Sequence, residues 1–544
     1  MHKLISTLAL SALVLPCPLS SLQAQGAVDL EMVTRIRNEG LHHSQVMETV
    51  THLTDGIGSR LTGSPQLKEA NEWTRKKLEE WGLANAHLEA YPFGRGWSFS
   101  KSAVRMVAPR EVPLSAIPKA WTPGTDGPVR GEVMRVDLES EEDFEEYRGK
   151  LAGKILFLDA IEGGEDPEEP GVRRYSREEL ESLAAFEAEE EREGGRRRRA
   201  FERQKLRQAT AEFLSAEKVA ATVERSGRLH GVVRVGAGGT WEPGENPGVP
   251  ALVMSREHYN KVVRMLDAGR PVELEVDVAA RFHDEDTRAY NTIAEIPGTD
   301  KKSEIVMAGA HLDSWHAATG ATDNAAGVAV VMEAVRILKT LGVKPRRTIR
   351  IALWTGEEQG YTGSLAYMKE HFATRPEPTD PEQKKLPERF REDTWPLILK
   401  PGHARLSAYF NLDNGTGKIR GIYAEENAAV KPIFEAWLAP FADLGADTVT
   451  LRRTGGTDHV PFDRIGLPGF QFIQDAMDYS TRTHHTHLDD LDHIRADDLK
   501  QASVIMASFL YHAAMRPEML PRKPLPQEPP KKDGKAAALD GGEG

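Results

Sequence analysis

The segment AGAHLDSWHAATGATDNAAG, residues 308–327, decides how the rest of the chain is interpreted. It begins at the end of an apolar run, residues 305–308, and places His311 and Asp313 just beyond that run. Asp323 follows directly before a long apolar pattern with helical spacing. An imidazole and a carboxylate at the end of a buried strand, with another carboxylate at a helix start, are a pattern typical of half a metal site. The remaining chain must supply the other half.

The C-terminal half of the chain alternates strand and helix patterns. This alternation predicts an α/β domain over residues 286–515, with a mixed open sheet and helices on both of its faces. Residues 373–402, rich in proline and charge, are expected to leave the sheet as an excursion. The expected strands are 305–310, 348–354, 407–412, 421–425, 448–453 and 469–474, and the expected helices are 324–341, 363–371, 427–443 and 496–515.

Two further parts precede this domain. Residues 28–94 carry helical patterns, including a helix that stops at Gly82, and are expected to be the N-terminal helical part of the same domain. Residues 95–285 carry short β-like runs separated by turns, which predict a β-rich unit of their own. Within that unit, residues 176–226 place acidic residues before two glycines and arginines after them. This pattern favours a helical hairpin with opposed charges.

The two ends of the chain are expected to lie outside the fold. Residues 1–24 show a positive start, an apolar run and a small residue, which indicate a secretory signal peptide. Cys17, the single cysteine, lies inside it, and the neighbouring Pro16 disfavours a lipoprotein anchor. The mature protein would then be secreted or periplasmic, without thiols and without an integral membrane segment. Residues 516–544 lack apolar content and are expected to be a disordered tail.

Length and charge limit the class of protein. A chain of 544 residues is expected to hold two domains with extensions. The formal net charge of −13 argues against nucleic acid or an anionic membrane as the main partner. The run Arg196 to Arg199 is therefore interpreted as a solvated face.

Polar residues follow the predicted strands at their carboxyl ends, where open α/β sheets bind ligands. Any one of them has an ordinary explanation, such as a helix cap or a loop charge. Crowded at one sheet edge, however, the carboxylates would repel one another unless cations neutralise them. Imidazole and carboxylate ligands without thiols suit zinc or a related first-row ion, and their number suits two ions. The set is His311, Asp313, Asp323, Glu357, Glu358, Asp413, His484, His485 and His487.

Five motifs carry a resemblance to a known family. They are HLDSW with TDNAAG, WTGEEQG, NLDNGTG, the HHTHLDD loop and the N-terminal IGSRLTGSP. Together they resemble the two-zinc exopeptidases that include aminopeptidase Y and the glutamate carboxypeptidases, over residues 45–515. The resemblance implies a zinc exopeptidase acting on dipeptides or short peptides. It also implies that the β-rich unit is a protease-associated domain.

The resemblance implies a role for each residue of the site. Asp313 would accept the ring N–H of a ligand histidine, and Glu357 would be the general base toward a metal-bridged hydroxide. His485 is preferred over His484 and His487 because Asp489 stands four residues after it. One zinc would be bound by His311 and Asp413, the other by Glu358 and His485, with Asp323 bridging the two.

The substrate pocket remains open at this stage. Some relatives carry a tyrosine immediately before the ligand histidine, where this chain has His484, so His484 and Tyr479 are both candidates for the oxyanion donor. Asp458 is expected to line the pocket or to cap a helix. An aminopeptidase needs carboxylates for the substrate amine, and a carboxypeptidase needs cations for the terminal carboxylate. The candidates are Asp458 and Asp475 for the amine, and Arg452, Arg453, Arg464 and Arg482 for the carboxylate.

Other functions are weighed against this one. The chain has neither G-x-S-x-G nor HExxH, which disfavours a serine hydrolase and a mononuclear zincin. A hydrolase of another small amide, such as an acylated amino acid, stays as an alternative. A non-catalytic binding protein on the same fold is disfavoured because the five ligands and the base are present. A small peptide is the expected partner, and a homodimer is compatible with the sequence.

Overall fold

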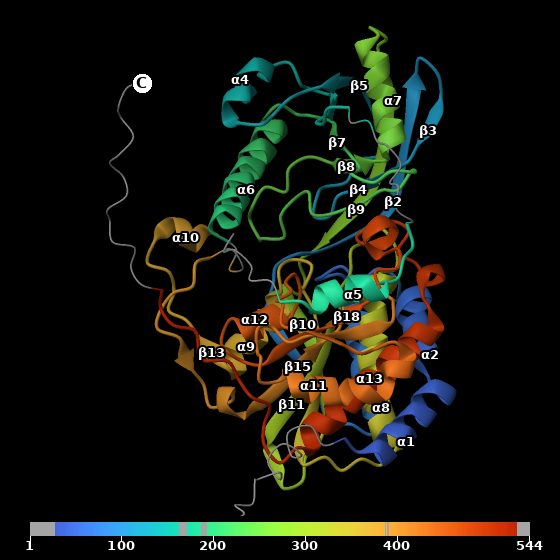
Figure 1. Ribbon diagram of the computed structural model, residues 1–544. Coiled ribbons are helices and arrows are strands. Elements are labelled where there is room, and N and C mark those ends of the chain that lie inside the picture. Colours follow the sequence, from blue (N-terminus) through green and yellow to red (C-terminus); the bar gives the residue numbers. More distant parts are fainter. Residues whose placement is uncertain are drawn as a thin grey trace, which may run out of the picture.

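The computed structural model describes residues 28–161, 163, 171–186, 193–386, 388 and 391–529, which form two sheet-based units (Figure 1). The unit at the bottom of Figure 1, called the lower unit here, is built on one eight-stranded sheet. The upper unit is built on another eight-stranded sheet, whose strands lie between Gly96 and His283. The expected signal peptide lies outside the described residues.

The lower sheet is mixed and has the strand order β1-β10-β12-β11-β15-β18-β16-β17. Its central strands β12, β11, β15 and β18 run parallel to one another. β10 is antiparallel to both β1 and β12, and β16 is antiparallel to β18. The mixed open sheet predicted from the sequence is confirmed. The bounds are β1 Ala84–Pro92, β10 Arg288–Ile296, β11 Lys301–His311, β12 Arg347–Trp354, β15 Leu406–Asn411, β16 Ile419–Tyr423, β17 Thr448–Thr450 and β18 Gly469–Gln474.

Helices cover both faces of the lower sheet because successive strand residues point to opposite sides. In β12, Ile351 and Leu353 pack into the core of one face, and Ala352 and Trp354 pack into the core of the other. The first face is covered by α1 Leu30–His42, α2 Val46–Thr51, α3 Pro65–Glu80, α8 Ala326–Thr340, α11 Lys431–Leu438 and α13 Ala496–Met515. The second face is covered by α9 Thr362–His371 and α12 His459–Asp463.

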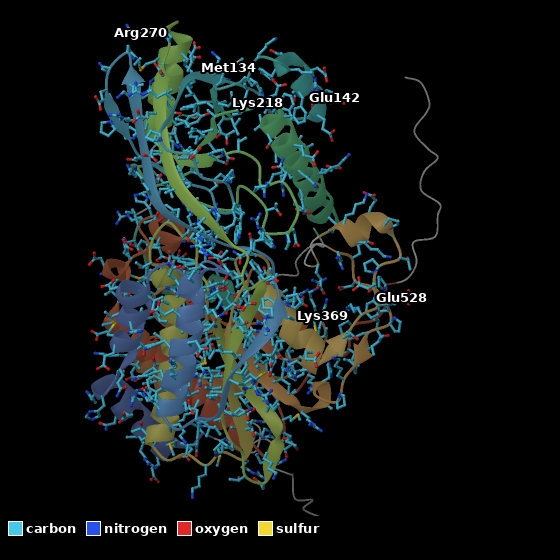
Figure 2. All side chains as sticks on the ribbon, turned by 180° about the vertical axis from the view of Figure 1, so that it is seen from behind. Met134, Glu142, Lys218, Arg270, Lys369 and Glu528 are labelled. Atoms are coloured by element: carbon cyan, nitrogen blue, oxygen red, sulfur yellow. The ribbon has the colours of Figure 1, made fainter. Side chains whose placement is uncertain are left out.

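The upper sheet has the order β3-β2-β9-β5-β6-β7-β8-β4. Its helix α7 covers one apolar core, and α4 and α6 cover another that contains Phe144 and Phe213. Met134, Lys218 and Arg270 mark the end of this unit that is remote from the lower sheet (Figure 2). The bounds are β2 Gly96–Ala108, β3 Val112–Leu114, β4 Ala116–Pro118, β5 Val129–Arg135, β6 Ile155–Phe157, β7 Ala221–Arg225, β8 Ala251–Met254, β9 Glu273–His283, α4 Phe144–Tyr147, α6 Glu193–Ala216 and α7 Arg256–Asp267.

The charged segment does not form the predicted helical hairpin. Its first helix, α5 Arg177–Ala184, packs on the lower unit, where Thr450 Oγ1 donates to the Leu183 carbonyl at 2.6 Å. Its second helix, α6, packs on the upper unit through Phe213. The hairpin prediction was wrong because it weighed only charge within the segment, whereas each helix has an apolar partner elsewhere.

The disorder predicted for the tail is wrong for its first part. Leu520 is only 2% exposed, and Arg522 donates to the carbonyl groups of His403 and Leu406 at 2.9 and 2.6 Å. Residues 516–529 therefore lie along the lower unit without regular secondary structure. Hydrogen bonds to backbone carbonyl groups hold them there, and amino-acid composition does not predict such contacts. Residues 530–544 lie outside the described part of the chain.

Two smaller features complete the lower unit. β1 lies in the segment expected to be helical; it was missed because an edge strand with half-exposed faces shows no alternating apolar pattern. The excursion after α9 contains α10 Pro381–Lys385 and a two-stranded sheet of β13 Ala373–Thr374 and β14 Ile398–Leu399. Within the described residues, no helix combines the length and the apolar character needed to cross a bilayer.

Candidate metal centre

The site lies at the carboxyl ends of three adjacent parallel strands, β12, β11 and β15. His311 is the last residue of β11, Glu357 and Glu358 follow the end of β12, and Asp413 follows the end of β15. Parallel strands bring their carboxyl ends to one edge of a sheet, so residues far apart in the sequence meet there. Asp323 reaches the same edge from the turn that precedes α8.

His311 is the centre of one half of the site. It is 1% exposed, and its Nε2 lies 3.3 Å from Asp413 Oδ1 and 3.3 Å from Asp323 Oδ1. Its other ring nitrogen, Nδ1, lies 3.0 Å from the main-chain carbonyl oxygen of Asp313. That carbonyl accepts the Nδ1 proton, so Nε2 is the ring nitrogen that would bind a cation held between the two carboxylates.

His485 is the centre of the other half. Its Nε2 lies 2.9 Å from Glu358 Oε2 and 3.3 Å from Asp323 Oδ2. The two oxygens of Asp323 therefore face two different histidines, the geometry of a bridging carboxylate. His484 lies farther away, with Nε2 at 3.9 Å from Asp323 Oδ2, and His487 Nδ1 instead accepts a hydrogen bond from Val233 N at 3.0 Å. The distances favour His485 among the three histidines.

The donor set fits cations. Asp323 Oδ2 and Glu358 Oε1 are buried and accept no hydrogen bond within the described structure. Burial, together with neighbouring carboxylates such as Asp413, raises the pKa of Glu358 well above its ordinary value. A buried carboxylate that lacks donors is costly to keep ionised, and a metal ion removes that cost.

The adjacent residue Glu357 is held differently. One oxygen of its carboxylate lies within 4.8 Å of a ring nitrogen of His311 and within 4.8 Å of a carboxylate oxygen of Asp413. Burial is the largest cause that raises the pKa of Glu357 well above its ordinary value. Its main-chain N–H donates to Asp313 Oδ1 at 3.3 Å, which fixes where its side chain starts. Glu358 is fixed from the other end, because Trp315 Nε1 donates to its Oε2 at 2.7 Å.

The role predicted for the Asp313 side chain needs correction. The His311 ring proton goes to the main-chain carbonyl of Asp313, and the carboxylate oxygen nearest to Nδ1 is 3.6 Å away. The Asp313 carboxylate instead accepts hydrogen bonds from Thr62 Oγ1 at 3.0 Å and from the main-chain N–H groups of Glu357 and Glu358 at 3.3 Å. It orders the glutamate turn and acts on the histidine through its own backbone.

Two supporting residues were missed in the sequence. Asp489, used there only to select a histidine, accepts hydrogen bonds from Thr322 Oγ1 and from the main-chain N–H groups of Thr322 and Asp323. Arg60 is fully buried and donates to the carbonyl groups of Leu312 and Gly320, among others. It ties the His311 strand end to the Asp323 turn. Arg60 lies in the quoted IGSRLTGSP motif, but a sequence pattern does not reveal a donor to distant carbonyls.

The pocket candidates occupy different positions. Tyr479 packs beside His484, with ring centroids 4.9 Å apart. Burial, and then the charges of Asp323 and Asp413, raise the pKa of the Tyr479 hydroxyl well above its ordinary value, so it stays a donor. Burial lowers the pKa of His484 to about 4, so its ring stays neutral near pH 7.

Asp458 is fully buried and does not cap α12, because no side-chain capping hydrogen bond is present. Its Oδ1 accepts from Ser364 Oγ at 2.5 Å, and its Oδ2 has no hydrogen-bond partner in the described structure. Burial raises the pKa of Asp458 to about 7. Its carboxylate thus lies behind the His311 half of the site, in a position to influence charge there.

Most candidates for binding the substrate ends are engaged elsewhere. Asp475 accepts from Arg174 and Arg420 at 2.8 and 2.9 Å and is fully buried. Arg453 pairs with Asp463 at 3.1 Å, and Arg464 pairs with Asp393 at 2.7 Å. Arg452 donates to the carbonyl groups of Ser182 and Ala185. These residues hold the fold together.

His316, which lies in the segment 308–327, joins the two units. Its Nε2 lies 2.7 Å from the carbonyl oxygen of Pro118 in β4, and its ring packs edge-on against Trp97. It is 5% exposed, and burial lowers its pKa to about 4. The neutral ring therefore donates from Nε2 to the upper unit.

Comparison with known proteins shows which family this part of the chain resembles. Residues 291–510, which include all five candidate ligands, match the family model described as Peptidase family M28. Over these residues the chain is similar to the peptidases of family M28. The resemblance drawn from the motifs is confirmed, and the chain is a metallopeptidase by family and by its cluster of possible metal ligands.

The relatives cover nearly the whole chain. The chain is 25% identical to carboxypeptidase Q of Bos taurus over 484 residues, which is 89% of this chain and 88% of the relative. It superposes on the crystal structure of a peptidase M28 precursor from Shewanella amazonensis with a TM-score of 0.63 and 26% identity, covering 92% of this chain and 99% of that one. A zinc aminopeptidase from Bacillus subtilis shares the fold, with a TM-score of 0.53, 18% identity and coverage of 86% of this chain and 94% of that one.

Proposed function

We propose that this protein is a secreted or periplasmic exopeptidase that uses two zinc ions to hydrolyse dipeptides or short peptides. The observation that carries the proposal is the Asp323 carboxylate, whose two oxygens face His311 and His485 on opposite sides. Glu357 stands beside this cluster and is not needed as a ligand. A bridging carboxylate with a free glutamate next to it supplies both a two-metal centre and a base.

The residues fit zinc better than a harder cation. Two imidazoles and three carboxylates surround the centre, and magnesium or calcium would favour oxygen ligands alone. His311 and Asp413 would hold one ion, His485 and Glu358 the other, and Asp323 would contact both. When bound, the ions would lower the pKa of a water molecule and polarise the scissile carbonyl.

Glu357 then performs the proton transfers. Its raised pKa comes chiefly from burial, so its carboxylate gains by accepting a proton from the attacking water. The same carboxyl delivers that proton to the nitrogen of the leaving amine. Trp315 holds the carboxylate of the adjacent Glu358, and Asp313 holds the backbone of the turn. The carboxylate of Glu357 is therefore left to transfer a proton and is not needed to bind a cation.

Tyr479 is the better candidate for a donor to the tetrahedral oxyanion. Its hydroxyl stays protonated and lies close enough to Asp323 and Asp413 for their charges to act on it. His484 packs on both Tyr479 and His485, with ring centroids 4.9 and 3.8 Å away, so it supports the two rings from one side. A preorganised donor at the oxyanion lowers the barrier of the addition step.

The first test uses Glu357→Gln, which keeps the shape of the side chain and removes its basicity. Loss of the base should lower kcat by about a thousand-fold on a dipeptide while metal content stays near two zinc ions per chain. Glu377→Gln, an exposed glutamate of the excursion, is the matched control. A Glu357→Gln protein that cleaves dipeptides as fast as the wild type would exclude the mechanism.

The alternative is a di-zinc hydrolase of another small amide, such as an acylated amino acid, and a substrate panel separates the two. Purified protein is offered free dipeptides and N-acyl amino acids. Faster cleavage of the acyl compounds would replace the peptidase proposal. A chain that binds under one zinc and cleaves neither class would favour the binding-protein alternative.

Secretion is tested separately. Expression of the full chain should give a mature N-terminus after residue 24 in the periplasm or medium, as read by N-terminal sequencing. Retention of residues 1–24 on cytoplasmic protein would contradict this part of the proposal.

A further inference from the structure

Residues 171–186, called the strap here, cross from the upper unit to the lower one. In the sequence they lie between β6 and α6, which both belong to the upper unit. The strap's helix α5 nevertheless packs on the lower unit (Figure 1). The strap therefore places residues from the upper unit's part of the chain on the lower unit, where they meet the loop of residues 475–487.

The strap holds the backbone of that loop on both sides of Tyr479. Arg173 and Met477 form an isolated antiparallel β-bridge, with N to O distances of 3.1 and 2.8 Å. Thr481 Oγ1 donates to the Gly171 carbonyl oxygen at 2.5 Å. Met477 stands two residues before Tyr479, and Thr481 stands two residues after it. The tyrosine is thus the centre of a short turn whose two ends are fixed by the strap.

Met477 needs this support because its backbone lies in the left-handed region, with a φ of +47°. That conformation is unfavourable for a residue with a Cβ atom, and it persists only where the surroundings fix it. The two backbone hydrogen bonds with Arg173 supply this fixation. Without them, Met477 would relax toward an ordinary conformation and the residues that follow, Tyr479 included, would move.

Arg174 anchors the strap. Its guanidinium donates to Asp475 at 2.8 Å and to Asp498 at 2.6 Å. Asp475 also accepts from the main-chain N–H of Tyr175 and from Arg420, both at 2.9 Å. Both aspartates are buried, so these ion pairs are screened less by solvent than pairs at the surface. Arg174 thus fastens the strap to the end of β18 and to the start of α13.

The Tyr479 ring has close neighbours as well. A Cβ atom added to Gly415 would lie 3.1 Å from Cβ, Cγ and Cδ2 of Tyr479, so the tyrosine packs directly against this glycine. On another side it packs beside His484, with ring centroids 4.9 Å apart. The tyrosine is therefore held through its backbone by the strap and through its ring by these two residues. A shift of its backbone displaces its hydroxyl group.

We propose that the strap is a positioning element: by fixing Met477 and Thr481, it holds the Tyr479 hydroxyl where it donates to the tetrahedral oxyanion. This inference rests on the proposed function and makes its oxyanion donor depend on a segment of the upper unit's chain. A donor stabilises the oxyanion only if it is already in place, and a shift of about 1 Å can cost about a hundred-fold in rate. Arg174 is then a positioning residue, which acts through the loop that it fastens.

Two variants release the strap in different ways. Arg174→Gln removes the ion pairs to two buried aspartates, and Arg173→Pro removes the N–H that donates to Met477. Each should lower kcat for a dipeptide by about ten- to a hundred-fold, with KM changed by less than about two-fold and two zinc ions bound. Arg173→Ala keeps the N–H and should lose less activity than Arg173→Pro. Arg148→Gln, which breaks an exposed ion pair with Glu145 in the upper unit, is the control and should keep kcat.

A double-mutant cycle with Tyr479→Phe shows whether the strap acts through the hydroxyl group. Tyr479→Phe alone should lower kcat by about a hundred-fold. In the Tyr479→Phe protein, Arg174→Gln should lower kcat by less than about three-fold more, because the positioned group is already gone. A purely structural role of Arg174 would lower kcat by the same factor in both backgrounds, and that result would overturn the inference. Wild-type kcat in Arg174→Gln, or in Tyr479→Phe, would overturn it too.

Binding supplies a readout that is independent of turnover. A phosphinic dipeptide analogue carries a tetrahedral oxyanion, whereas a dipeptide analogue with CH2–NH in place of the amide carries none. Both are titrated by calorimetry into the zinc-loaded proteins. Arg174→Gln should bind the phosphinic analogue about ten- to a hundred-fold more weakly than the wild type, and the CH2–NH analogue equally well. Equal loss of both analogues, or loss of neither, would overturn the inference. A wild type that neither cleaves peptides nor binds the phosphinic analogue would instead overturn the proposed function itself.

Discussion

The two halves of the metal centre are built in different ways. The His311 half is made by strand ends of one sheet, and its histidine is 1% exposed and backed by a main-chain carbonyl. The His485 half is made by a loop, its histidine side chain is 20% exposed, and it is backed by Arg234 from the upper unit. One half thus depends on local sheet geometry, and the other depends on how two units dock.

The two halves therefore differ in which unit fixes their geometry. The strand-end half is enclosed by Asp313, Thr62 and the glutamate turn, so its geometry follows from the lower unit alone. The loop half takes its outer contacts from residues 226–240 of the upper unit. Functional variation is more easily carried by loops on a rigid scaffold than by the scaffold itself.

Asp323 belongs to both halves, and its loss should have the largest effect. Asp323→Asn keeps the shape but removes the charge that faces His311 and His485. We expect bound zinc to fall below one ion per chain and kcat/KM to fall by at least about a thousand-fold. Metal analysis and a dipeptide assay measure both. Asp492→Asn, at an exposed position, is the control, and two retained zinc ions in Asp323→Asn would refute a bridging role.

Asp313 belongs only to the strand-end half, and its loss should cost less. Asp313→Asn weakens the acceptor for Thr62 and for the N–H groups of Glu357 and Glu358. We expect kcat to fall by about ten- to a hundred-fold with zinc still bound, because the base and a ligand shift together. If Thr62→Val lowers kcat as well, although by less, the effect runs through this carboxylate. An unchanged kcat in Asp313→Asn would show that the glutamate turn is ordered without the charge of this carboxylate.

Four of the candidate residues could be placed together from the sequence because their signals are local. His311, Glu357, Glu358 and Asp413 each follow an apolar run that forms a central strand, and parallel strands must share an edge. The choice of His485 needed the family resemblance, because three histidines stand in one loop without periodicity.

What the sequence could not supply were contacts between units and between backbone and side chain. Arg234 and His316 meet their partners only when the upper unit docks on the lower one. The helical hairpin failed for the same reason, since α5 and α6 find partners in different units. Charge within a segment carried no information about these long-range contacts.

Removal of the metal should make stability depend on pH in a defined direction. Burial raises the pKa of Asp458 to about 7 and that of Glu357 well above its ordinary value. In the unfolded chain such groups titrate near pH 4, so ionisation increasingly penalises the folded metal-free protein as pH rises from about 4 to 7. Bound cations cancel this penalty. The difference in Tm between zinc-loaded and chelated protein should therefore grow by roughly 5 °C between pH 5 and pH 8.

Calorimetric scans at constant ionic strength measure this difference. The same scans on Glu357→Gln should show a smaller increase, because one of the ionising groups is gone. A Tm difference that shrinks as pH rises would mean that the carboxylates are satisfied without metal.

His316 offers the smallest effect and the most direct test of docking. It donates to the Pro118 carbonyl as a neutral ring, and burial lowers its pKa to about 4 from about 6.5 in the unfolded chain. A base with a lowered pKa stabilises the fold above pH 6.5, and this stability is lost as pH falls toward 4. The loss for this group is at most about 3 kcal/mol.

His316→Gln keeps a donor for Pro118 and removes the titration. We expect the free energy of unfolding to be within about 1 kcal/mol of wild type at pH 7.5, since only packing against Trp97 changes. Between pH 6.5 and 4.5 the wild type should lose stability more steeply than the variant, as measured by denaturant unfolding at each pH. Parallel curves would show that the pKa of His316 is not lowered in the folded protein and that acid opens the molecule elsewhere. A steeper wild-type curve would locate the acid-sensitive joint between the two units at His316.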